Sequence, residues 1–198
     1  MKNLIIISVI CLASFSMIAC NNTNKSASNS PKDSTGTNSA GTSNPAKSGV
    51  DSKTTAAVKE MVGNYLNLKN ALAKDNSADA ATAGKALSEG FMKFDQSALT
   101  PTQKKSFTDI ADDAKEMAEH IGMSGGKLPH QREHFDMLSK DMIDFVKLFS
   151  AGQGLYVDHC PMYNNNKGAD WLSETKEIRN PYLGTKMPTC GSVKEELK

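Results

Sequence analysis

The chain has 198 residues with 23 basic and 22 acidic side chains, so it carries almost no net charge. Binding of nucleic acid through its phosphates needs clustered lysine and arginine, and this balance excludes that class of protein. The composition changes along the chain. Its start is apolar, residues 21–50 contain no aromatic residue and have Asn, Ser or Thr at 17 of 30 positions, and residues 51–198 resemble a globular domain. A domain of that length can bury a core.

Residues 1–19 have the pattern of a bacterial secretory signal. Lys2 supplies one positive charge, and an uncharged, mostly apolar run follows it as far as Ala19. The run is too short to read as a permanent membrane span. Its end, Ser16-Met17-Ile18-Ala19-Cys20, resembles a lipobox, in which the cysteine is lipidated and becomes the first mature residue. We therefore predict a lipoprotein signal peptide over 1–19 and a lipid anchor at Cys20, with an ordinary signal peptide cut nearby as the alternative.

Residues 20–50 predict a disordered tether between this anchor and the globular part. A chain so rich in Asn, Ser and Thr behaves as a flexible coil, which suits a domain held near a membrane. Asn21 is not the Asp that retains some lipoproteins at the inner membrane. We expect a periplasm-facing protein anchored in the outer membrane rather than the inner one.

Residues 51–198 begin with four stretches in which apolar residues recur with helical spacing. The first follows a cap at Asp51 or Ser52, the second follows the turn Asp75-Asn76-Ser77, the third starts at Thr100-Pro101, and the fourth starts near Pro129. Gly152-Gln153-Gly154 ends the fourth. Four helices of similar length with short connections predict an all-α fold, an antiparallel four-helix bundle. We expect the remaining residues to pack on this bundle as ordered, mostly irregular structure.

This C-terminal segment concentrates soft metal ligands. Cys160 and Met162 form one pair beside His159, and Met187 and Cys190 form a second pair 30 positions later. Thiolates and thioethers favour Cu(I) and similar ions over Mg²⁺ or Ca²⁺. The segment lacks the paired Cys-x-x-Cys motifs of a structural zinc ribbon, and two cysteines are too few for an iron–sulfur cluster.

A disulfide is the alternative reading of the same two cysteines. In an oxidising compartment Cys160 and Cys190 could form a bond that closes the segment into a loop and holds it on the bundle. The residues alone leave disulfide and metal site open.

Histidines on the expected helices are further candidate ligands. His130 and His134 lie four positions apart, so both project from one face of the fourth helix. Their order with Glu133 differs from the His-Glu-x-x-His of zinc peptidases, and His134 could equally be a buried histidine of the core. His120, close to Met117 and Met123, would meet the start of the fourth helix across the turn. We expect it to be a surface residue, with membership of a His/Met cluster there as the alternative.

Several short motifs together resemble a bacterial domain family of unknown function. They are Pro129-His130-Gln131-Arg132-Glu133-His134-Phe135, His159-Cys160-Pro161-Met162, Gly168-Ala169-Asp170-Trp171-Leu172-Ser173, Glu177-Ile178-Arg179-Asn180-Pro181-Tyr182, Met187 and Cys190-Gly191. The resemblance covers roughly residues 55–195. Members look like stand-alone lipoproteins or C-terminal extensions of periplasmic adaptor subunits in copper/silver RND efflux systems, which implies heavy-metal handling by association. The candidate metal ligands that it carries over are His130, His134, Cys160, Met162, Met187 and Cys190.

The sequence thus predicts a membrane-tethered periplasmic protein that binds Cu(I) or a comparable ion and buffers it or delivers it to an efflux adaptor. The alternative is a disulfide-stapled helical module that docks on an envelope or efflux protein without binding metal. We do not expect an enzyme, because adjacent His159 and Cys160 side chains rarely converge as base and nucleophile.

Overall fold

A computed structural model describes residues 51–198. The predicted signal peptide, the lipidated Cys20 and the tether therefore lie outside the described residues. Within the described part of the chain, no helix combines the length and the apolar character needed to cross a membrane.

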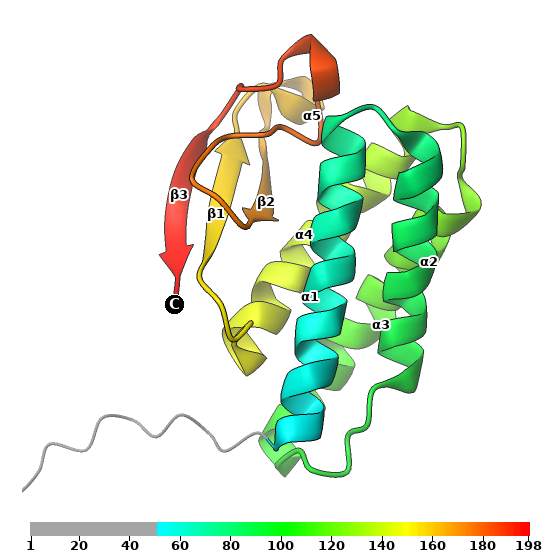
Figure 1. Ribbon diagram of the computed structural model, residues 1–198, viewed down its shortest axis with the longest axis vertical. Helices are drawn as coiled ribbons and strands as arrows, with labels where there is room; N and C mark the ends of the chain where they lie inside the picture. Colours follow the sequence, from blue (N-terminus) through cyan, green and yellow to red (C-terminus); the bar gives the residue numbers. More distant parts are fainter. Residues whose placement is uncertain (1–50) are drawn as a thin grey trace, which may run out of the picture. The chain divides into compact units, whose positions relative to one another are not determined.

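Four long helices form the body of this part, as predicted (Figure 1). They are α1 (Ser52–Ala73), α2 (Ser77–Lys93), α3 (Pro101–Met123) and α4 (Leu128–Phe149). The predicted caps are present: the side chains of Asp51 and Asn76 accept from backbone N–H groups of the first turns, and Thr100 forms a capping box with Gln103. The prediction of a four-helix bundle is supported, since each helix packs against the next along the chain.

The core of the bundle combines aromatic side chains with one close helix contact. Phe94 stacks on Phe107 with ring centroids 4.4 Å apart, and Phe145 meets both rings. At the other end of the α2–α3 contact, a Cβ added to Gly84 would lie 2.9 Å from the carbonyl oxygen of Ala118. This glycine lets α2 approach the C-terminal half of α3 closely.

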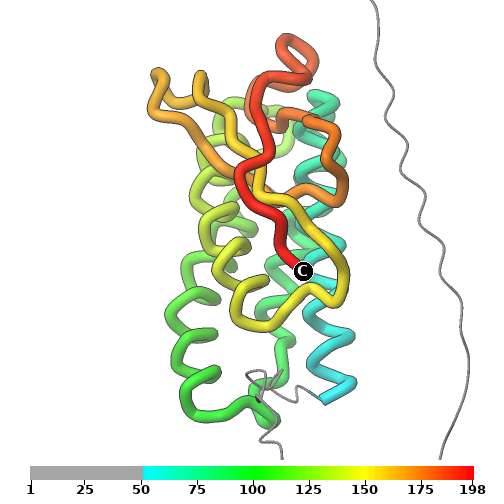
Figure 2. Tube along the Cα trace, turned by 90° about the vertical axis from the view of Figure 1, so that its left-hand side faces the viewer, coloured from blue at the N-terminus to red at the C-terminus, as the bar shows by residue number. Residues whose placement is uncertain are grey.

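The segment after α4 is not the mostly irregular structure that we predicted, and the all-α assignment is to that extent wrong. It contains an antiparallel sheet in the order β2-β1-β3, formed by β1 (Leu155–Cys160), β2 (Ala169–Ser173) and β3 (Ser192–Leu197). The short helix α5 (Tyr163–Asn166) connects β1 to β2, and the 3-10 helix η1 (Gly184–Lys186) lies between β2 and β3. Figure 2 shows the chain turning after α4 and running back beside the bundle as β1.

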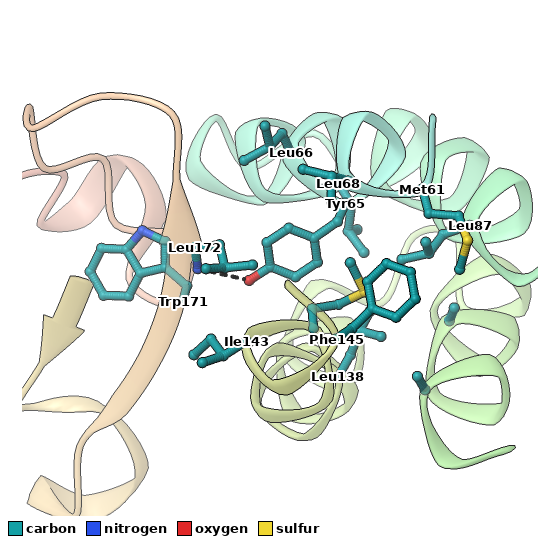
Figure 3. Close-up of a cluster of buried hydrophobic side chains, with 14 of the residues drawn as sticks. Met61, Tyr65, Leu66, Leu68, Leu87, Leu138, Ile143, Phe145, Trp171 and Leu172 are labelled. Atoms are coloured by element: carbon teal, nitrogen blue, oxygen red, sulfur yellow. Dashed lines mark hydrogen bonds between the residues drawn. The ribbon is translucent and has the colours of Figure 1, made fainter. Parts of the chain in front are cut away.

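Tyr65 joins the sheet to the bundle. Its hydroxyl lies 2.7 Å from Ser139 Oγ on α4 and accepts a hydrogen bond from the backbone N–H of Leu172 on β2 at 3.2 Å (Figure 3). The side chain is fully buried and its ring stacks on Phe135. One residue of α1 therefore fixes the position of both α4 and β2.

Candidate functional site

Three of the four histidines gather where α3 ends and α4 begins. His120 comes from the last turn of α3, and His130 and His134 come from the first two turns of α4. One ligating nitrogen from each ring can be chosen so that all three lie within 4.8 Å of one another. We call these three residues the imidazole cluster.

The spacing inside the cluster suits a shared metal ion. The Nε2 atoms of His130 and His134 are 3.2 Å apart. Two nitrogens bound to one tetrahedral ion at about 2.0–2.1 Å are separated by about 3.3 Å. A hydrogen bond between two imidazoles has a similar length, so it is the third ring, that of His120, which distinguishes this arrangement from a simple pair. The Sδ atom of Met117 lies 3.3 Å from Nδ1 of His134, the ring nitrogen opposite the one that faces His130, so the sulfur holds this ring from its other side and does not share an ion with His130.

The electrostatic setting favours the neutral, metal-binding form of His134. Burial lowers the pKa of His134, and the neighbouring His130 and His120 lower it further. Only a neutral imidazole has a lone pair for a metal. Glu133 Oε2 lies 3.4 Å from Nδ1 of His130, the ring nitrogen that faces away from His134, and a carboxylate at that place is typical of metal-bound histidines.

The turn between α3 and α4 is fixed by a buried glutamine. The Gln131 side chain donates hydrogen bonds to the carbonyl oxygens of Ser77 and Ile121 and accepts one from the Ser77 hydroxyl. Gly126, whose φ of 85° is unfavourable for other residues, donates its N–H to the same hydroxyl. The end of α3, the start of α4 and the start of α2 are thereby held together, which sets the distances within the imidazole cluster.

Arg132 lies between the two α4 histidines in sequence, but its side chain binds the end of α1 and the C-terminal segment instead of the imidazole cluster. Its guanidinium donates to the carbonyl oxygens of Leu72 and Pro181 at 2.9 and 2.8 Å and pairs with Asp75. The hydrogen bonds from Thr185 and Arg132 lower the pKa of Asp75 to about 2. The first turns of α4 therefore carry the imidazole cluster on one face and hold the C-terminal segment with the other.

The two cysteines form a separate pair. Their Sγ atoms are 3.5 Å apart, with Cys160 buried at the end of β1 and Cys190 partly exposed. Burial and the neighbouring Cys160 raise the pKa of the Cys190 thiol. A disulfide requires about 2.05 Å and two ligands on one ion about 3.8 Å, so the pair is close to both arrangements.

The predicted ligands thus fall into two places instead of one. His130 and His134 face α3, and no group of three His, Cys, Asp or Glu ligands in residues 51–198 joins them to the cysteines. The side chains of Met162 and Met187 are exposed. His120 belongs to the cluster and its side chain is 42% exposed, so it combines the surface position that we expected with the His/Met cluster that was the alternative. The signal for it was its position one helical turn from Met117, next to the tight turn.

These features define a helical bundle with a small sheet and a candidate metal centre at one helix junction. Residues 61–154 match the family described as "Protein of unknown function (DUF3347)". The chain therefore contains a domain of unknown function, as the resemblance predicted. The matched segment includes the imidazole cluster and ends before both cysteines. Among curated proteins and solved structures, none matches the chain.

Proposed function

We propose that the protein binds a heavy-metal ion, with copper as Cu(I) the preferred cargo, and buffers it or passes it on. The observation that carries this proposal is the convergence of three imidazoles at the α3–α4 junction. Imidazole donors suit copper better than the hard ions Mg²⁺ and Ca²⁺.

The cluster has properties of an exchangeable binding site. His130 is exposed, whereas His120 and His134 are partly buried, so an ion held there would remain accessible to a partner. A site that stores a metal permanently is usually closed by four protein ligands. We therefore favour binding and transfer over a structural metal, and we propose no enzymatic reaction.

The proposed cellular setting comes from the N-terminal sequence and the family resemblance. A lipid on Cys20 would anchor the protein to a membrane facing the periplasm, preferably the outer membrane, and residues 20–50 would let the domain move beside it. A heavy-metal efflux adaptor is the partner that this setting suggests.

A competition titration with matched histidine variants tests the metal site. The full chain carrying Cys190→Ser, which removes the competing thiol pair, should bind Cu(I), and adding His134→Ala should weaken binding at least tenfold, or about 1.4 kcal/mol. Adding His159→Ala instead is the control, because His159 pairs with Asp170 on the sheet and lies outside the cluster. Equal dissociation constants for all three proteins would refute the site.

The second candidate function is a helical interaction module stapled by a disulfide, and the cysteine pair favours it. The bond would form if the two sulfur atoms approached by about 1.5 Å and the two thiols lost two electrons and two protons to a thiol oxidant of the periplasm. Free-thiol titration of the protein isolated from the periplasm should then find no reactive thiol at Cys160 or Cys190. Two free thiols, protected by one equivalent of Cu(I), would instead make the pair a second metal site.

A further inference from the structure

Methionine accounts for nearly all the large hydrophobic side chains that are exposed in the described part of the chain. Within residues 51–198, six large hydrophobic side chains are exposed, and five of them are methionines: Met92, Met123, Met137, Met162 and Met187. Leucine, isoleucine and phenylalanine are all at least partly buried in the same region. The surface therefore keeps thioethers exposed while other apolar side chains of similar size are removed from water.

Two of these methionines lie one helical turn from the imidazole cluster. Met123 follows His120 by three positions at the end of α3, and Met137 follows His134 by three positions on α4. Residues three apart on a helix are neighbours, with Cβ atoms about 5–6 Å apart. Met123 is 67% exposed and Met137 is 42% exposed.

A third methionine, Met117, lies three positions before His120 on α3, is partly buried, and places its Sδ against Nδ1 of His134, the ring nitrogen opposite the one that faces His130. On α3, Met117 and His120 are both partly buried, and Met123 at the end of the helix is exposed. Thioethers coordinate soft ions such as Cu(I) and Ag(I), whereas the side chains that bind Zn²⁺ in proteins are those of cysteine, histidine, aspartate and glutamate.

Resting on the proposed function, we infer that Met123 and Met137 form a thioether path by which a monovalent soft ion enters and leaves the imidazole cluster. The exposed sulfurs meet the ion or its donor first, and the imidazoles then hold it. Each step exchanges one soft ligand for another at a neighbouring position, so the ion need not be fully released into water. The path makes the protein a carrier selective for Cu(I) or Ag(I).

Transfer kinetics test the path. The full chain carrying Cys190→Ser, which removes the competing thiol pair, is loaded with Cu(I) without oxygen and mixed with bathocuproine disulfonate in a stopped-flow instrument. Met123→Leu and Met137→Leu should each slow transfer by about tenfold, equivalent to about 1.4 kcal/mol in the barrier. The equilibrium dissociation constant should change much less, because the imidazoles remain.

Two controls separate the path from the site itself. Met92→Leu is the matched control, since Met92 is 63% exposed in the last turn of α2 and has no cluster histidine as a helical neighbour. Release of Zn²⁺ should be the same in all variants. Equal Cu(I) transfer rates for all the proteins, or equal slowing by Met92→Leu, would overturn the path while leaving the metal site intact. If the Cys190→Ser chain with all its methionines takes up no Cu(I), both this proposal and the proposed metal site are overturned.

Discussion

The buried carboxyl of Asp158 should make the stability of the protein depend on pH in a specific way. Asp158 is fully buried on β1, and neither of its carboxyl oxygens has a hydrogen-bond partner within residues 51–198. Burial raises its pKa, Lys69 opposes the change and Glu174 adds to it, so that the pKa moves from 3.8 to about 7. The folded protein therefore holds the proton on this carboxyl more tightly than the unfolded chain does.

The sign and size of the effect follow from this difference. A carboxyl whose pKa is higher in the folded state contributes its full stability below pH 4, and that contribution is lost as the pH rises through about 7. The change in pKa from 3.8 to about 7 corresponds to about 4 kcal/mol in the free energy of unfolding. Asp158→Asn cannot ionise, so it should gain up to this amount relative to the unaltered protein between pH 4 and pH 8.

Urea denaturation at a series of pH values measures this difference directly. The free energy of unfolding of the Asp158→Asn protein minus that of the unaltered protein should rise with pH, because contributions from all other groups cancel. Asp112→Asn, which alters an exposed residue of α3, is the control and should show little change. A difference that is independent of pH for Asp158→Asn would show that the carboxyl is ionised or hydrated in the folded state, and would refute the reasoning.

Three further outcomes follow from the structure. Tyr65→Phe should lower the free energy of unfolding by about 1–3 kcal/mol in urea denaturation, since it leaves the buried Leu172 N–H without its acceptor; an unchanged midpoint would contradict that role. Gly184→Ala should cost at least about 1–2 kcal/mol by the same measurement, because its φ is 55° and a Cβ would collide with Asp75 and Arg132. Cu(I) affinity should fall as the pH is lowered from about 7 to about 5, since protons compete for the imidazoles; a constant affinity would argue against imidazole ligands.

The helical part of the fold could be predicted because its signals are local. The capping residues Asp51, Asn76 and Thr100 begin helices as predicted, and the apolar spacing between them marks the buried faces. These signals require no knowledge of distant contacts.

The sheet could not be predicted because each strand departs from simple alternation. A bulge between Val157 and Asp158 interrupts the period of β1, so that two adjacent residues are both buried. Strand β3 is exposed along almost its whole length and has no apolar pattern. Its pairing with β1 depends on backbone hydrogen bonds between residues far apart in the chain.

The candidate site was predictable only in part, for a similar reason. Helical spacing placed His130 and His134 together on one face of α4. The contribution of His120 and Met117 depends on the orientation of α3 across the turn that Gln131 fixes, and helical spacing within one element does not encode it. The same orientation explains why the histidines face α3 rather than the cysteines.

The location of a bound copper ion tests the central proposal most directly. Crystals of the protein grown with Cu(I) and measured at the copper absorption edge should give an anomalous difference peak between His120, His130 and His134. A single peak between Cys160 and Cys190, or no peak in a protein saturated with copper in solution, would contradict the account.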